Sequence, residues 1–178
     1  MTSLTPERET DGALAVAPSR RGWRLAAYAV LIVALVAAVG WVSTHPEPLE
    51  TADRKVFAST PVTEPVYVGV YATRADFGRT LHVSGVRVFA TASAEVSIVP
   101  RVCHGGSVHV TTTPETFCAE LGPTEGATLE AGDEIVLEVT GVAPTVVRID
   151  RIRVAYRDGL QWATQDAGAA SEVSILAR

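Results

Sequence analysis

The 178-residue sequence contains no asparagine, only two cysteines and a single lysine, and it lacks the common catalytic motifs. Without asparagine there is no N-glycosylation sequon. No nucleophile elbow, HExxH motif or glycine-rich phosphate loop is present either. Ser107, His109 and Asp133 can be written as a hydrolase triad, but sets of this kind arise by chance in most domains. We therefore predict no catalytic site, no cofactor and no enzymatic activity.

Charged residues are absent from Leu25 to Thr44, and this gap is the most informative feature of the chain. About twenty uncharged, mostly apolar residues in a helix span the roughly 30 Å hydrocarbon core of a bilayer. Trp23 and Trp41 lie about 27 Å apart along such a helix, as expected for indole rings at the two interfaces. We predict a membrane-spanning helix over residues 23–44. Five residues are predicted at the membrane interfaces: Arg20, Arg21, Trp23, Arg24 and Trp41.

The arginines precede the span, whereas the first charges after it are acidic. The positive-inside rule then predicts a single-pass protein of the cell membrane, with a cytoplasmic N-terminus and an extracytoplasmic C-terminal domain. A signal peptide cleaved after a site such as Ala38-Val39-Gly40 and a twin-arginine export signal at residues 19–25 are the alternatives. All three interpretations export the same domain.

Composition divides the rest of the chain into three parts. Residues 1–22 predict a disordered cytoplasmic tail, because residues 1–19 lack hydrophobic periodicity. Residues 45–64 and the following Pro65 hold four prolines and alternating charges, which predicts a semi-extended stalk. Residues 65–178 are long enough for one domain. From residue 45 onward, 11 basic and 17 acidic residues give a net charge of about −6, which argues against nucleic-acid binding.

Alternation of apolar and polar residues predicts short strands throughout residues 65–178. Eight segments show it: 66–71, 81–88, 96–100, 108–111, 135–139, 147–156, 160–164 and 173–175. The parity of the apolar positions shifts at Gly85 and again across Asp150-Arg151, which predicts a bulge at the first and a bulge or kink at the second. Residues 165–168 predict a turn. The fold expected is mainly β, an immunoglobulin-like antiparallel sandwich behind one transmembrane helix. The Cys…Trp…Cys spacing of true immunoglobulin domains is absent, so the likeness is architectural and names no family.

Cys103 and Cys118 predict a disulfide, since two cysteines in one exported domain most often pair. Closing a loop of about 16 residues stabilises a fold by roughly 3 kcal/mol in the chain-entropy model. The loop is either a structural staple or a stapled recognition loop. A Cys2His2 metal set with His104 and His109 has no common zinc spacing, so we predict no metal site.

Arginines concentrate on one predicted strand and suggest a binding face. Four residues are candidates for partner binding: Arg148, Arg153, Arg157 and Trp162. The arginines could instead form cross-strand salt bridges with Glu134 and Glu138, and Trp162 is either a core residue or an exposed anchor.

These observations predict a single-pass membrane protein whose extracytoplasmic domain serves interaction or scaffolding. Its expected partners are the bilayer, through the helix, and other envelope proteins or wall polymer. The alternatives are binding of an envelope polymer or ligand through the loop 103–118 and, third, an envelope hydrolase. No nucleic-acid partner is expected.

Overall fold

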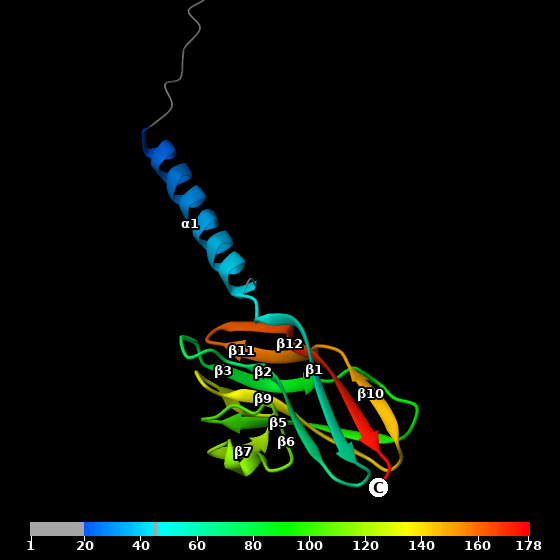
Figure 1. Cartoon of the computed structure of the whole chain (residues 1–178). Helices are drawn as coiled ribbons and strands as arrows, with labels where there is room; N and C mark the ends of the chain where they lie inside the picture. The colour runs from blue at the N-terminus through cyan, green and yellow to red at the C-terminus, as the bar shows by residue number, and fades with distance from the viewer. Residues whose placement is uncertain (1–19, 45) are drawn as a thin grey trace, which may run out of the picture. The chain divides into compact units, whose positions relative to one another are not determined.

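The computed structural model describes residues 20–44 and 46–178, which form one α-helix, a short 3-10 helix and twelve strands (Figure 1). The described part of the chain divides into two compact units, with the boundary between Gly40 and Trp41. The tail predicted at 1–22 lies mostly outside the described residues, as do the side chains of Arg20 and Arg21.

Helix α1 (Arg20–Thr44) begins three residues before the predicted start. Its segment Gly22–Ser43 has a mean hydropathy of 2.5, and none of it is buried. By its length and composition, α1 is therefore apolar enough to cross a membrane. Trp23, Arg24 and Trp41 are exposed on it.

The first sheet contains seven strands in the order β4-β10-β12-β11-β3-β8, with β1 beside β12. Their bounds are β1 (Thr51–Pro61), β3 (Leu81–Arg87), β4 (Ala90–Thr91), β8 (Thr128–Leu129), β10 (Thr145–Ile149), β11 (Ile152–Asp158) and β12 (Gln161–Leu176). The long strand β12 pairs with β11 over its first half and with both β10 and β1 over its second half. The β1–β12 pairing is parallel, whereas the others in this sheet are antiparallel.

The second sheet is antiparallel, with five strands in the order β6-β2-β9-β5-β7. Their bounds are β2 (Val66–Ala72), β5 (Val96–His104), β6 (Val110–Thr111), β7 (Glu120–Pro123) and β9 (Glu134–Gly141), with the 3-10 helix η1 at Pro114–Thr116.

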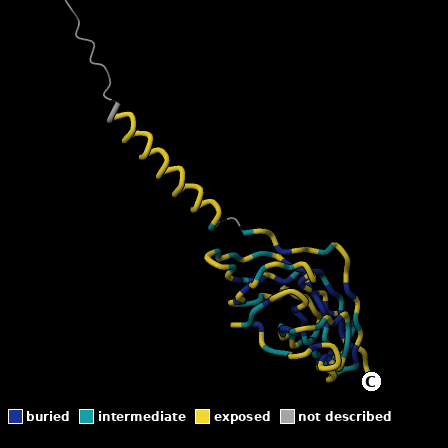
Figure 2. The backbone as a smooth tube through the Cα atoms, turned by 90° about the vertical axis from the view of Figure 1, so that its left-hand side faces the viewer, coloured by how far each residue is buried: buried dark blue, intermediate teal, exposed yellow. Residues whose placement is uncertain are grey.

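The core lies between the two sheets, because every second side chain of the main strands points inward. Ile135, Leu137 and Val139 of β9 are fully buried in one cluster with Val154 and Tyr156 of β11. Figure 2 shows the buried backbone positions gathered inside residues 46–178. The prediction of a mainly β, sandwich-like domain behind an apolar helix is therefore confirmed.

The bulge predicted at Gly85 is present. Ala155 of β11 pairs with Gly85, but the next residue, Tyr156, pairs with Val83, so Ser84 is the extra residue. The second parity change, at Asp150-Arg151, is a break between β10 and β11.

The predicted stalk is wrong for most of its length. Eleven of its residues form β1, which pairs with β12 from Thr51↔Gly168 to Pro61↔Leu176. Val56 and Thr60 are buried, and so is Leu49 just before the strand. The prolines flank this strand or end it, where a missing N–H costs no ladder hydrogen bond.

Two strand boundaries also differ from the prediction. The turn expected at 165–168 lies inside the continuous strand β12, where Gly168 adopts a positive φ of 73°. Strand β5 runs through Pro100 to His104 instead of ending at the proline. Proline fits there because β7 pairs with β5 only from Arg101 onward.

Candidate interaction surface

The disulfide joins Cys103 at the end of β5 to Cys118, as predicted. Both cysteines pack with Val108 and Val136 in a small second core on the side of β9 that faces away from the main core. Val136 is fully buried because the loop between the cysteines covers it. With both sulfurs in the disulfide, the Cys2His2 alternative has no thiolate to offer a metal. Within residues 20–44 and 46–178, no group of three or more potential metal ligands occurs.

Two adjacent carboxylates hold the backbone of this loop. Asp133 accepts hydrogen bonds from the N–H groups of Gly105 (3.0 Å) and Glu130 (2.9 Å) and lies 3.1 Å from His104 Nδ1. Glu134 accepts one from the N–H of Val108. Asp133 thus meets His104, and no hydrogen bond or ion pair among the described residues joins it to Ser107 or His109, the other members of the triad written from the sequence.

Glu134 is a buried acid, only 5% exposed. Burial is the main cause that raises its pKa above the ordinary 4.5, against the hydrogen bond from Val108 and the charge of Arg54, which lower it. The folded protein therefore holds this proton more tightly than the unfolded chain does. The contribution of Glu134 to stability is greatest below pH 4.5 and declines as pH rises through its raised pKa.

Glu134→Gln should remove this decline while keeping an oxygen for the Val108 N–H. The free energy of unfolding of the variant, relative to the parent, should rise from acid to neutral pH and then level off. Urea unfolding at several pH values between 4 and 8 measures it. Glu120→Gln, which removes an exposed carboxylate on β7, is the control and should follow the parent curve. A pH-independent difference for Glu134→Gln would contradict the assignment.

One of the four predicted partner-binding residues, Arg148, lies on the outer face of the first sheet, which we define by Lys55, Phe57, Val146, Arg148 and Glu172. Pairing places Phe57, Glu172 and Arg148 side by side across β1, β12 and β10. The Glu172 carboxylate lies 3.5 Å from Arg148 and 3.7 Å from Lys55. Phe57 stays 67% exposed beside these charges.

Arg153 continues this surface on β11. Its Nε donates to Asp166 at 2.8 Å, and its guanidinium lies 5.5 Å from the centre of the Phe89 ring. The hydrogen bond from Arg153 is the largest cause that lowers the pKa of Asp166. These three side chains line a groove of about 520 Å³ with Asp53 and Arg151, which pair at 2.5 Å. The groove's other lining residues are Ala52, Arg54, Lys55, Asp150 and Ala170.

Arg157 and Trp162 are the other two predicted residues, and they lie elsewhere. Arg157 is four residues from Arg153, about 13 Å along β11. It pairs across the hairpin with Trp162, with its guanidinium 5.8 Å from the indole ring. Trp162 is 67% exposed, so it is a surface residue and not a core residue.

The acidic partners differ from those expected. Arg148 and Arg153 pair with Glu172 and Asp166 of β12, whereas Glu138 pairs with Arg101 at 3.1 Å in the other sheet and Glu134 is buried.

Sequence reasoning missed Lys55 and Phe57, because both fell in the expected stalk. A weak signal was present, because Val56 and Ala58 alternate with the polar Lys55 and Ser59, although the apolar Phe57 interrupts the pattern.

Comparison of the chain with models of protein families, with curated proteins and with solved structures found no match. The function must therefore be argued from the geometry.

Proposed function

We propose that the chain is a single-pass membrane protein whose extracytoplasmic domain binds an envelope protein through the outer face and its groove. The observation that carries the proposal is the combination of exposed aromatic rings with arginines held in place. Phe57 is 67% and Phe89 39% exposed, and Arg148 and Arg153 are each fixed by an acid of β12. Aromatic residues and arginine are the side chains enriched in protein–protein interfaces.

The charge pattern favours a protein over a polyanionic polymer. Five basic residues belong to this surface: Arg54, Lys55, Arg148, Arg151 and Arg153. Four acidic ones lie among them: Asp53, Asp150, Asp166 and Glu172. A surface of mixed sign complements a partner that also carries both signs, whereas a polyanion would meet the acids as well as the bases.

Two observations support the extracytoplasmic location. The arginines lie on the N-terminal side of the apolar helix, which favours a cytoplasmic N-terminus. The Cys103–Cys118 disulfide is typical of oxidising compartments. The immunoglobulin-like topology stays a prediction.

The single lysine gives a direct test, because Lys55 lies on the outer face with its side chain 45% exposed. A membrane-impermeant, amine-reactive crosslinker added to intact cells should couple the full chain to a defined envelope protein through Lys55. Lys55→Arg keeps the positive charge and should lose the crosslink. Arg148→Glu with Arg153→Glu should reduce the crosslink at least tenfold, since each reversal places a like charge beside an acid of β12.

Arg101→Glu is the matched control. Arg101 is also paired with a glutamate, Glu138, but lies in the second sheet. Its variant should keep the crosslink at the parent level. A crosslink that is equally strong in the double reversal would overturn the outer face as the binding site. Reaction of Lys55 only after the cells are permeabilised would overturn the orientation.

A further inference from the structure

The β11–β12 hairpin carries an exposed apolar tip. Its turn runs from Asp158 through Gly159 to Leu160, which is 92% exposed, the highest value among the exposed large hydrophobic residues. Trp162 follows at 67% exposed, with Arg157 beside its ring. None of the residues that define the outer face belongs to this tip. A protruding leucine and tryptophan next to an arginine form an amphipathic tip that suits a surface with both apolar and anionic groups.

The chain enters the sandwich beside the same hairpin, where the Tyr156 hydroxyl of β11 lies 3.5 Å from the Glu47 carbonyl. Leu49 is 5% exposed, and its N–H donates to the Gln165 side chain at 2.8 Å. The Glu47 carbonyl accepts from Arg79 at 3.2 Å. Arg79 in turn lies 3.7 Å from the Glu47 carboxylate and 3.5 Å from Asp158 in the hairpin turn.

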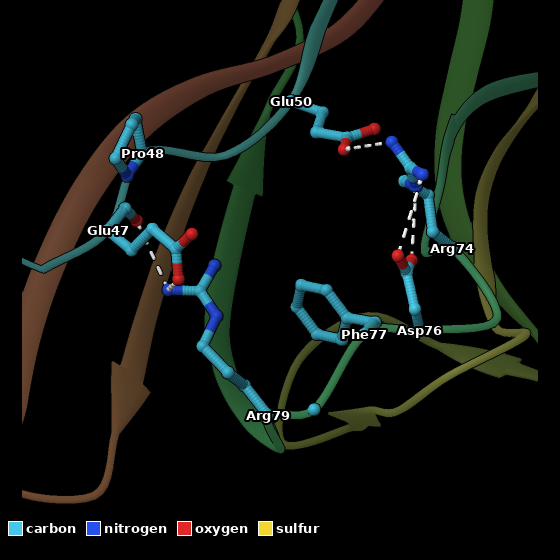
Figure 3. A pocket seen from close by; sticks show the side chains of 8 residues that line it. Glu47, Pro48, Glu50, Arg74, Asp76, Phe77 and Arg79 are labelled. Atoms are coloured by element: carbon cyan, nitrogen blue, oxygen red, sulfur yellow. Dashed lines mark hydrogen bonds and ion pairs between the residues drawn. The ribbon is translucent and has the colours of Figure 1, made fainter.

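The neighbouring pocket shown in Figure 3, of about 230 Å³, has its charges paired in the same way. Arg74 lies between Glu50 at 3.4 Å and Asp76 at 3.1 Å, and the guanidinium of Arg79 lies 5.1 Å from the centre of the Phe77 ring. These ion pairs link the entering segment to the sandwich at Glu47 and Glu50.

Chain length then limits where this hairpin can be. Only residues 45 and 46 separate Thr44, the last residue of α1, from the fastened Glu47. Three steps of an extended chain reach at most about 11 Å. The headgroup region on each side of a bilayer is roughly 5–8 Å thick. If α1 spans the membrane, the hairpin that holds Glu47 cannot leave the neighbourhood of the headgroups.

We propose that the hairpin tip, residues 158–162, rests on the bilayer that α1 crosses, with Leu160 and Trp162 entering the headgroup region. Tryptophan favours this region because the indole ring is apolar but its N–H needs a polar partner. Arg157 faces lipid phosphate, and pairing with Arg79 neutralises Asp158. This contact fixes the orientation of the sandwich on the membrane. It rests on the membrane-spanning role proposed for α1.

Tryptophan quenching in vesicles tests this contact. The full chain is reconstituted in phosphatidylcholine vesicles, with acyl chains either plain or brominated close to the headgroup. A variant that keeps only Trp162, made by Trp23→Phe and Trp41→Phe, should lose fluorescence in the brominated vesicles. Adding Leu160→Asp, which removes an apolar contact and brings in a negative charge, should restore most of it.

Two further variants separate the possible failures. A variant that keeps only Trp41 reports on α1 itself and should also be quenched. The control Phe57→Trp, in a background without the native tryptophans, places an exposed indole about 30 Å along β12 from the tip and should not be quenched. Quenching of Trp41 without quenching of Trp162 would overturn the tip contact alone. Absence of quenching for Trp41 would overturn the membrane span.

Discussion

Replacing both cysteines by alanine should lower the free energy of unfolding of the domain by about 3 kcal/mol, or Tm by roughly 10 °C. The disulfide restricts the unfolded chain by closing the loop from Cys103 to Cys118. In the folded state it also holds the loop over Val136, which packs with both cysteines and Val108 in the small second core. Chemical denaturation of the oxidised protein and of the Cys103→Ala, Cys118→Ala variant measures the difference.

Val136→Ala separates the two contributions. It keeps the covalent loop but removes contacts beneath it, so its loss reports packing alone. Adding a reductant should weaken the Val136→Ala protein further and leave the cysteine-free protein unchanged. Equal stability of the parent with and without the disulfide would show that the second core holds the loop by itself.

The same region shows what sequence patterns do and do not reveal. Alternation predicted β9 correctly, since Ile135, Leu137 and Val139 face the main core. It did not reveal that Val136 is equally buried, because the cover comes from a separate part of the chain, the loop between Cys103 and Cys118. A period of two identifies a strand, but it does not show what lies on each of its faces.

Long-range pairing explains the larger error, the missed strand β1. Its partner β12 lies more than a hundred residues later, as the pairing of Ser59 with Ser174 illustrates. The local alternation around Val56 and Ala58 is weak and does not identify a partner strand, whereas the prolines around the segment are visible and suggested a stalk. The strand's exposed residues Asp53, Arg54 and Lys55 also resemble linker composition, although charged residues on an edge strand protect it from adding further strands.

The sequence identified only part of the candidate site, again because local patterns do not identify the long-range pairing of β12 and β1. Arg148 and Arg153 were recognisable as outward charges on one strand pattern. Their partners Glu172 and Asp166 lie on β12, which the sequence divided into a strand at 160–164, a turn at 165–168 and a short final strand at 173–175. Once β12 is continuous, both acids stand opposite the arginines, and β1 brings Lys55 and Phe57 to the same surface.

Gly168 makes that continuity possible, and Gly168→Ala should be the most damaging single substitution considered, at about 4 kcal/mol or more. Its φ of 73° is a conformation that side chains disfavour. A Cβ there would also lie 2.0 Å from the oxygen of Val70 in β2. Because this oxygen belongs to the backbone, it cannot move aside as the end of a flexible side chain could. The two sheets would have to separate where β12 passes from β11 to β10 and β1.

Gly126→Ala supplies the comparison that isolates this effect. Gly126 has a similar φ of 78°, but a Cβ there meets nothing within 4 Å. Its variant should lose only the conformational strain, about 1–2 kcal/mol. Urea unfolding of both variants beside the parent gives the two losses, and their difference is the cost of the contact with Val70. Similar losses at the two glycines would mean that β2 and β12 can move apart freely. In that case, the close packing of the sheets at Gly168 would not be what keeps β12 in register. The register is what places the acids of β12 opposite Arg148 and Arg153.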